Sequence, residues 1–427
     1  MAVPAPASSA SIPSTTLTST TLTTPGLVLV EHELVVPLDH QNAGGETITV
    51  FAREVASPEG RERPFLVFLQ GGPGSEAPRP TGAPTSPGWL GRALVDHRVL
   101  MLDQRGTGRS APVGDLPGMT AEEQATYLTH FRADAIVADA ELLREALGVD
   151  CWSVLGQSFG GFCALHYLSI APDSLHAAYL TGGLPPVARH PDEVYAATWA
   201  RQREQVERHW ARWPGDRERF LALHARLEAE PLPTPGGALT ARMLRYAGHR
   251  LGMSDGSEHL HVLLELPEGS PAFRWGAADL MGFARNPLYA VLHESSYADG
   301  ATTGWSADRT RPADFDEDPS LLFGEHLHPW VLDDVDGLAP LARAGRLLAD
   351  HPWPRLYDPA VLADNDVPVA AAVYADDPYV DATFSMETAR AVRGARAWLT
   401  NEHLHNGLRA DGVQVLDRLI AMARGRA

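Results

Sequence analysis

A serine in the segment GQSFG, residues 156–160, has the G-x-S-x-G spacing of a catalytic nucleophile. The apolar run CWSVL precedes it and the apolar segment FGGFCALHYLSIA follows, so the serine stands between a predicted strand and a predicted helix. A sharp turn in that context exposes the serine hydroxyl at the end of the strand. The N–H group of Phe159, at the start of the helix, can then donate to an oxyanion. We predict that Ser158 is a nucleophile; the alternative is a glycine-rich turn that serves packing alone.

A second glycine-rich segment, QGGPG at residues 70–74, directly follows the apolar run FLVFL. Backbone N–H groups in such a loop can face a substrate carbonyl and complete an oxyanion hole. We predict Gly72 as the donor, with Gly71 as the alternative. A GGPG turn alone has little meaning, because Gly and Pro form turns everywhere. Its position one strand–helix unit before the serine gives it weight.

A serine nucleophile needs a general base and an acid that orients the base. Enzymes with the nucleophile on such a turn carry the acid and then the histidine later in the chain. Asp376 and Asp377 follow the apolar run VPVAAAVY, and His403 and His405 follow the run RAWLT. On chemistry alone, either aspartate and either histidine could serve.

Three His-x-His pairs also invite a zinc interpretation, since alternate residues on a strand can chelate a metal. They are His259/His261, His326/His328 and His403/His405. No HExxH or CxxC motif accompanies them, and two pairs lie in helical segments, where residues i and i+2 diverge. We expect neither a metal nor a cofactor.

The charge and hydropathy of the chain exclude other functions. Its 427 residues include 35 basic and 54 acidic side chains, a formal net charge of −19. We therefore expect no nucleic-acid partner, because a phosphate backbone is bound by clustered cationic side chains. No apolar run reaches the roughly 18 residues of a membrane span. The N-terminus lacks the cationic start and apolar run of a secretory signal, so we expect a cytoplasmic protein.

Alternating patterns along the chain predict the elements that position these residues. The runs FLVFLQ, HRVLMLDQ, CWSVLG and AAYLTGG are continuously apolar, which is typical of parallel strands covered on both faces. Residues 132–148 repeat apolar side chains at helical spacing between two of these runs. The fold class predicted is α/β, a mostly parallel sheet with helices on both faces.

We predict four parts along the chain. Residues 1–26 are rich in Ser, Thr, Pro and Ala and form a flexible arm. Residues 27–187 and 356–427 form the two parts of the sheet domain. Residues 188–355 contain helical segments and no buried strand run, and form an inserted helical cap domain.

Five segments together resemble the proline iminopeptidase (prolyl aminopeptidase) family of α/β-hydrolases in its longer form. They are QGGPG, DQRGTGRS, GQSFGG, YADDPYVD and TNEHLHNGLR. The resemblance spans most of residues 27–427 and is weaker across the insertion. Gln70 stands where the family commonly has histidine, which leaves the backbone donors of the loop in place. The resemblance implies an α/β-hydrolase fold and a cofactor-free serine peptidase.

The resemblance also implies which later residues complete the site. Asp377 corresponds to the acid and His405 to the base. His403 falls where the family tends to carry an aromatic residue, so we expect it beside the site. The implied catalytic triad is Ser158, His405 and Asp377, with the N–H groups of Gly72 and Phe159 as the oxyanion hole.

The resemblance implies an aminopeptidase that releases N-terminal proline from peptides with a free N-terminus. In the family, glutamates of the cap bind the substrate α-ammonium; Glu294 corresponds best, and Glu258 and Glu265 are weaker candidates. The same fold leaves open an esterase, an amidase or a broader, tripeptidyl-type peptidase. A more remote alternative is a non-catalytic binding protein. We expect a monomer or a small homo-oligomer.

Overall fold

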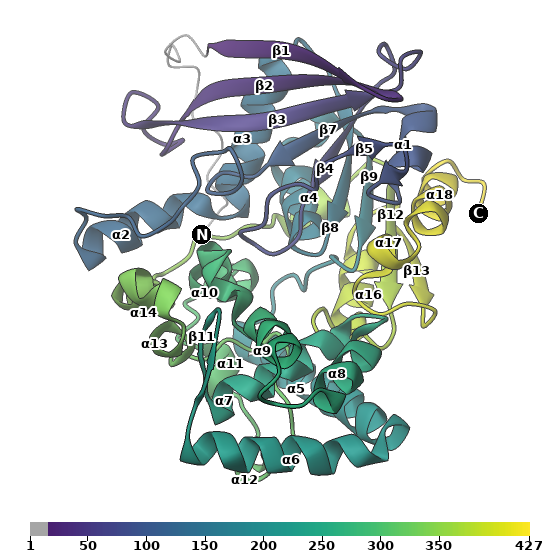
Figure 1. Cartoon of the computed structure of the whole chain (residues 1–427). Helices are drawn as coiled ribbons and strands as arrows, with labels where there is room; N and C mark the ends of the chain where they lie inside the picture. The colour runs from purple at the N-terminus through teal and green to yellow at the C-terminus, as the bar shows by residue number, and fades with distance from the viewer. Residues whose placement is uncertain (1–15) are drawn as a thin grey trace.

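A nine-stranded sheet forms the centre of the molecule (Figure 1). The computed structural model describes residues 16–427, apart from the side chain of Met281. The strands lie in the order β1-β2-β3-β7-β4-β8-β9-β12-β13. Their bounds are β1 (Leu17–Thr24), β2 (Leu27–Pro37), β3 (Thr47–Ala56), β4 (Phe65–Leu69), β7 (Arg98–Asp103), β8 (Trp152–Gln157), β9 (Leu175–Thr181), β12 (Val369–Tyr374) and β13 (Arg396–Thr400). Neighbours from β7 to β13 are parallel, and β1, β2, β3 and β7 pair antiparallel. The predicted fold class is confirmed.

Helices cover both faces of the sheet. Their bounds are α1 (Leu90–Asp96), α2 (Ala121–Leu128), α3 (Ala133–Ala146), α4 (Phe159–Ile170), α15 (Pro359–Ala363), α16 (Ala382–Ala391), α17 (Gly407–Ala410) and α18 (Gly412–Ala423). Alternate residues of a strand point to opposite faces. In β4, Leu66 and Phe68 therefore pack with α1 and α18, whereas Val67 packs with α3 and α4. This two-sided burial explains why the central strands are continuously apolar.

Between β9 and β12 the chain forms a second group of helices, teal to green in Figure 1. They are α5 (Pro191–Arg212), α6 (Pro214–Ala229), α7 (Ala241–Leu244), α8 (Gly256–Glu265), α9 (Pro271–Ala278), α10 (Pro287–Leu292), α11 (Ser306–Arg309), α12 (Asp314–Glu317), α13 (Val331–Asp334) and α14 (Ala342–Ala349). Two short hairpins, β5–β6 (Thr81–Gly82, Thr85–Ser86) and β10–β11 (Leu232–Thr234, Gly237–Leu239), lie outside the main sheet. Single-turn and 3-10 segments separate many of these helices, so the insertion is irregular.

The predicted flexible arm, residues 1–26, contains an ordered strand, which corrects that part of the prediction. All of β1 pairs antiparallel with β2, from Leu17 opposite Leu34 to Thr24 opposite Leu27. Nearly all β1 side chains are exposed, so backbone hydrogen bonds and the β propensity of Thr hold the strand, rather than apolar burial. Composition could not reveal this. Residues 1–15 lie outside the described residues.

Across residues 16–427, no helix combines the length and the apolar character that a bilayer crossing requires.

Candidate active site

Ser158 occupies a strained turn between β8 and α4. Its φ of +54° and ψ of −125° lie in a region that side-chain-bearing residues rarely adopt. The chain passes so close to itself here that a Cβ built on Gly160 would lie 1.9 Å from the carbonyl oxygen of Leu69. A Cβ on Gly156 would lie 2.4 Å from the carbonyl oxygen of Gly160. The glycines of the motif are therefore needed for this turn, which presents the Ser158 hydroxyl at the carboxyl end of β8.

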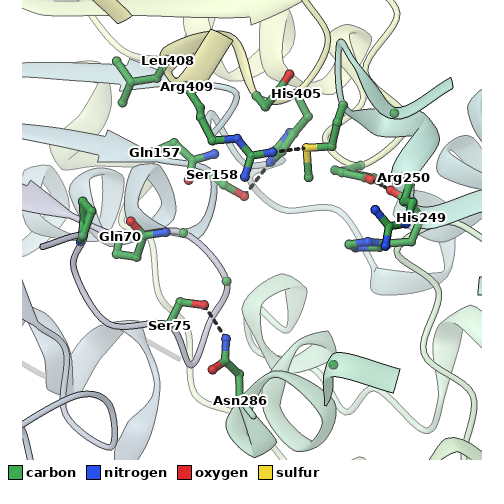
Figure 2. Close-up of a pocket in the computed structure, with 18 of the residues that line it drawn as sticks. Gln70, Ser75, Gln157, Ser158, His249, Arg250, Asn286, His405, Leu408 and Arg409 are labelled. Carbon is green, nitrogen blue, oxygen red and sulfur yellow. Dashed lines mark hydrogen bonds between the residues drawn. The ribbon is translucent and has the colours of Figure 1, made fainter. Parts of the chain in front are cut away.

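The loops after β12 and β13 bring an aspartate and a histidine to Ser158. The His405 Nε2 atom lies 2.8 Å from Ser158 Oγ (Figure 2), and His405 Nδ1 lies 2.7 Å from Asp377 Oδ2. The other Asp377 oxygen, Oδ1, accepts a hydrogen bond from the N–H of Tyr379 at 2.8 Å. With Nδ1 donating to the carboxylate, Nε2 is left to accept the serine proton. These two contacts have the geometry of a Ser-His-Asp catalytic triad.

The alternative aspartate and histidine make other contacts. Asp376 accepts a hydrogen bond from Arg208 at 3.1 Å, and its carbonyl oxygen accepts one from Gln205 at 2.7 Å. The His403 ring packs edge-on against Tyr374 at 6.2 Å. Asp377 and His405 therefore form a hydrogen-bonded chain with Ser158. Asp376 and His403 make other contacts and are not part of this chain.

The protonation of His405 depends on two opposing influences. Burial lowers the pKa of the imidazole, but the Asp377 carboxylate, by its charge and hydrogen bond, raises the pKa above its ordinary value. The Asp377 carboxylate therefore stabilises the protonated form of His405. The same effect makes His405 take up a proton, and stop acting as a base, at a higher pH than a free histidine.

The glycine loop after β4 lies against the nucleophile. A Cβ on Gly71 would lie 2.9 Å from the Ser158 Cβ, and Gly72 has a φ of +130°, which a glycine adopts freely. Gln104 holds the loop by donating from Nε2 to the carbonyl oxygen of Gln70 at 2.9 Å. Phe159 opens α4, where the first N–H groups have no acceptor within the helix. The loop and the helix start therefore flank Ser158.

A cavity of about 1000 Å³ opens above Ser158, between the sheet and the insertion. Figure 2 shows Gln70 and Ser75 from the glycine-loop side and His249, Arg250 and Asn286 from the insertion side. Tyrosines at positions 246, 289 and 379 supply aromatic walls. The cavity beside Ser158 therefore has both polar and aromatic walls.

Glu325, which was not among the residues predicted from the sequence, is the least exposed of the acidic side chains that line this cavity from the insertion. Its carboxylate accepts a hydrogen bond from the Tyr289 hydroxyl at 2.9 Å and lies 3.3 Å from His293 Nε2. Its side chain is only 12% exposed. Burial alone would raise the pKa of Glu325, but His293 above all, then His405 and His249, lower it to about 2. The neighbouring imidazoles therefore favour the ionised form of the Glu325 carboxylate.

The three glutamates predicted to bind an ammonium group lie outside the cavity. Glu294 is buried beneath the start of α11, where it accepts hydrogen bonds from the N–H groups of Ser306 and Ala307 at 3.1 and 2.8 Å. Burial raises its pKa. Glu258 and Glu265 lie on α8, where the Glu258 side chain is partly exposed and the Glu265 side chain is about half exposed. The sequence pattern did not predict where these glutamate side chains point, because the insertion contains many short helices and turns. A charged residue inside the apolar segment LLFGEHLHPW was the available signal for Glu325.

The histidines of the pair His326/His328 contact other side chains of the insertion. His326 stacks on Trp199 with 3.6 Å between ring centroids, and His328 Nδ1 lies 2.7 Å from Asp308 Oδ1. Within residues 16–427, no three His, Cys, Asp or Glu side chains are grouped so that they could hold a metal ion.

Comparisons with known proteins agree with this architecture. A family model described as "alpha/beta hydrolase fold" matches residues 64–233. The proline iminopeptidase of Aeromonas sobria is 46% identical over 420 residues, which cover 93% of this chain and 97% of that protein. The proline iminopeptidase aneH of Aspergillus aculeatus is 31% identical over 93% of this chain and 94% of its own length. The chain therefore belongs to the proline iminopeptidase family of α/β-hydrolases.

Proposed function

We propose that this protein is a serine aminopeptidase that releases N-terminal proline from peptides. One observation carries the proposal: Ser158, hydrogen-bonded to His405, lines the same cavity as the Glu325 carboxylate, whose side chain is only 12% exposed. A nucleophile that shares a cavity with a carboxylate suits a substrate whose reacting carbonyl belongs to the residue that carries the free amine. The two full-length relatives named proline iminopeptidase support the same activity.

The first half of the reaction forms an acyl-enzyme. Ser158 Oγ attacks the carbonyl carbon of the N-terminal proline while its proton passes to His405 Nε2. Asp377 stabilises the imidazolium through Nδ1–H. The carbonyl oxygen becomes an oxyanion, for which the N–H groups of Phe159 and Gly72 are the proposed donors. His405 then protonates the peptide nitrogen, the C–N bond breaks, and the shortened peptide leaves.

The second half reverses these roles with water. Water gives a proton to His405 and adds to the prolyl ester of Ser158. The tetrahedral intermediate collapses, the serine oxygen takes back its proton, and proline is released. Throughout, the Glu325 carboxylate pairs with the substrate ammonium, since a cation in a desolvated cavity needs an anion. The surrounding tyrosine rings contact the pyrrolidine ring.

A substrate panel with a matched pair of variants tests the proposal. Wild-type protein should cleave prolyl p-nitroanilide much faster than the leucyl and alanyl compounds and than N-acetylprolyl p-nitroanilide. Glu325→Gln should lower kcat/KM for the free prolyl substrate by roughly 10²-fold, the usual scale for removing one partner of a buried ion pair. Glu265→Gln, on an exposed carboxylate, is the control and should leave kcat/KM unchanged.

The same panel separates the alternatives. Equal cleavage of free and blocked prolyl substrates would overturn the aminopeptidase proposal. Hydrolysis of p-nitrophenyl esters without any amide cleavage would indicate an esterase instead. Failure of a fluorophosphonate to label Ser158 would indicate a binding protein without catalysis.

A further inference from the structure

The proposed oxyanion donor Gly72 lies in a loop with little stiffness of its own. Three of the four residues 71–74 are glycine, and glycine has more backbone freedom than any other residue. A donor stabilises an oxyanion best when it is already in place, because moving it during the reaction would cost energy. The side chains that hold this loop therefore influence the rate of the reaction.

The sheet domain holds the two ends of the loop. Gln104 Nε2 donates to the carbonyl oxygen of Gln70 at 2.9 Å. At the other end, Asp103 Oδ1 accepts a hydrogen bond from the N–H of Ala77 at 3.1 Å. The middle of the loop, residues 71–76, lies between these two contacts.

The middle of the loop also contacts the insertion, at the start of α10. A Cβ on Gly74 would lie only 2.8 Å from the backbone nitrogen of Tyr289. Asn286, directly before α10, donates from Nδ2 to Ser75 Oγ at 2.9 Å (Figure 2). Ser75 Oγ in turn lies 3.6 Å from the position of a Cβ on Gly72. Only the Ser75 side chain therefore separates the Asn286 amide from the proposed oxyanion donor.

The Asn286 amide is oriented for this contact. Its Oδ1 accepts a hydrogen bond from Arg285 Nη1 at 2.8 Å, which leaves Nδ2 facing Ser75. Arg285 also pairs with Glu76, the next residue of the loop. An asparagine directly before a helix commonly accepts a hydrogen bond from an N–H group of the first turn, but Asn286 makes no such bond. Its amide contacts the loop instead of capping the helix.

We propose that Asn286 is a positioning residue that, through Ser75, holds the loop of Gly72 in the geometry that binds the oxyanion. The inference rests on the proposed function, in which the Gly72 N–H is an oxyanion donor. The oxyanion exists only in the tetrahedral states of the reaction. The contact should therefore raise kcat and leave the binding of the unreacted substrate unchanged.

Steady-state kinetics with prolyl p-nitroanilide test this role. Asn286→Ala and Ser75→Ala should each lower kcat by about tenfold, the scale of one lost hydrogen bond, with KM changed by less than about twofold. The double variant should be no slower than either single variant, because both changes remove the same contact. Asn286→Asp should recover part of kcat, since the Ser75 hydroxyl can donate to a carboxylate. Asn42→Ala, on the exposed turn between β2 and β3, is the control and should keep the wild-type kcat.

A second measurement distinguishes positioning of the loop from a general loss of structure. Pyrrolidine-2-boronic acid takes Ser158 Oγ as the fourth ligand of boron and so resembles the tetrahedral intermediate, whereas free proline does not. Asn286→Ala should weaken inhibition by the boronic acid by about tenfold and leave inhibition by proline unchanged.

Three results would overturn the role of Asn286. They are a wild-type kcat in Asn286→Ala, losses in the two single variants that multiply in the double variant, and equal weakening of inhibition by the boronic acid and by proline. A loss that appears in KM alone would likewise contradict positioning of an oxyanion donor. Absence of prolyl cleavage by the wild-type protein would instead reject the proposed function.

Discussion

At the residue scale, the contacts of His405 fix its orientation and influence the pH at which it takes up a proton. The imidazole is held between Ser158 Oγ and Asp377 Oδ2 by contacts of 2.8 and 2.7 Å. Its backbone N–H donates to the carbonyl oxygen of Gly252 in the insertion at 3.0 Å. The histidine is therefore fixed at both its ring and its backbone, and small changes around it should have large kinetic effects.

Removal of either reacting side chain should abolish turnover. Ser158→Ala and His405→Ala should each lower kcat for prolyl p-nitroanilide by roughly 10⁴–10⁶-fold, because neither residue can work without the other. His403→Ala should retain most activity, since that ring packs on Tyr374 outside the hydrogen-bonded set. Circular dichroism should show all three variants folded. Full activity in His405→Ala would contradict the assignment of the base.

The pH profile should report the Asp377–His405 contact. Because the carboxylate raises the pKa of His405, kcat/KM of the wild-type protein should fall on acidification at a higher pH than an ordinary histidine would give. Asp377→Asn removes the charge, so the acidic limb should move to lower pH while kcat drops by about 10⁴-fold. An acidic limb that stays in place in Asp377→Asn would show that another group controls it.

At the element scale, close packing between the sheet and α4 fixes the turn that carries Ser158. The insertion forms hydrogen bonds with the loops that carry Asp377 and His405. Gln205 on α5 donates to the carbonyl oxygen of Asp376, just before the proposed catalytic acid, Asp377. The Ser254 N–H donates to Asn406 Oδ1 at 2.9 Å, just after the proposed catalytic base, His405. The insertion therefore contacts the loops that carry Asp377 and His405, as well as lining the cavity.

The strand–helix turn should not tolerate a methyl group at its tightest point. Gly160→Ala would place a Cβ 1.9 Å from the Leu69 carbonyl oxygen, which forces a backbone shift and should cost about 3 kcal/mol or more in the free energy of unfolding. Gly215→Ala is the matched control, because nothing lies within 4 Å of its Cβ position on α6. Thermal unfolding should show a much lower Tm for Gly160→Ala alone; equal Tm values would contradict the close packing.

At the scale of the whole molecule, the cavity is lined by residues from two parts of the chain, the sheet with its loops and the insertion. Ser158 is carried by the sheet and Glu325 by the insertion, and both line the same space. A ligand that contacts both residues can bind only the folded protein, because only folding brings the two residues to one cavity. Its binding should therefore stabilise the protein as a unit.

Free proline should raise Tm. A ligand that binds only the folded state, at 100 times its Kd, adds about 2.7 kcal/mol to the free energy of unfolding. N-acetylproline, which has no ammonium group, should raise Tm far less, and Glu325→Gln should lose most of the response to proline. Differential scanning fluorimetry over a proline titration measures both. Equal stabilisation by the two ligands would contradict pairing between Glu325 and the ammonium.

The sequence by itself determined the parts of the protein that depend on short stretches of chain. The nucleophile turn needs glycine at positions 156 and 160 because backbone atoms approach there, so the motif is visible in five residues. The central strands are visible because burial on both faces makes them continuously apolar. The loops that carry the acid and the histidine follow from strand order, and the resemblance selected Asp377 and His405 within them.

Only the tertiary structure decided which acidic residue faces the substrate cavity. Glu294, Glu258 and Glu265 lie in segments of helical character, but short helices and 3-10 turns give no steady period from which a side-chain direction follows. Packing of the insertion turns Glu325 inward and Glu294 toward a helix start. The exposed strand β1 was likewise set by pairing with β2. Long-range contacts fix these features, and local sequence does not encode them.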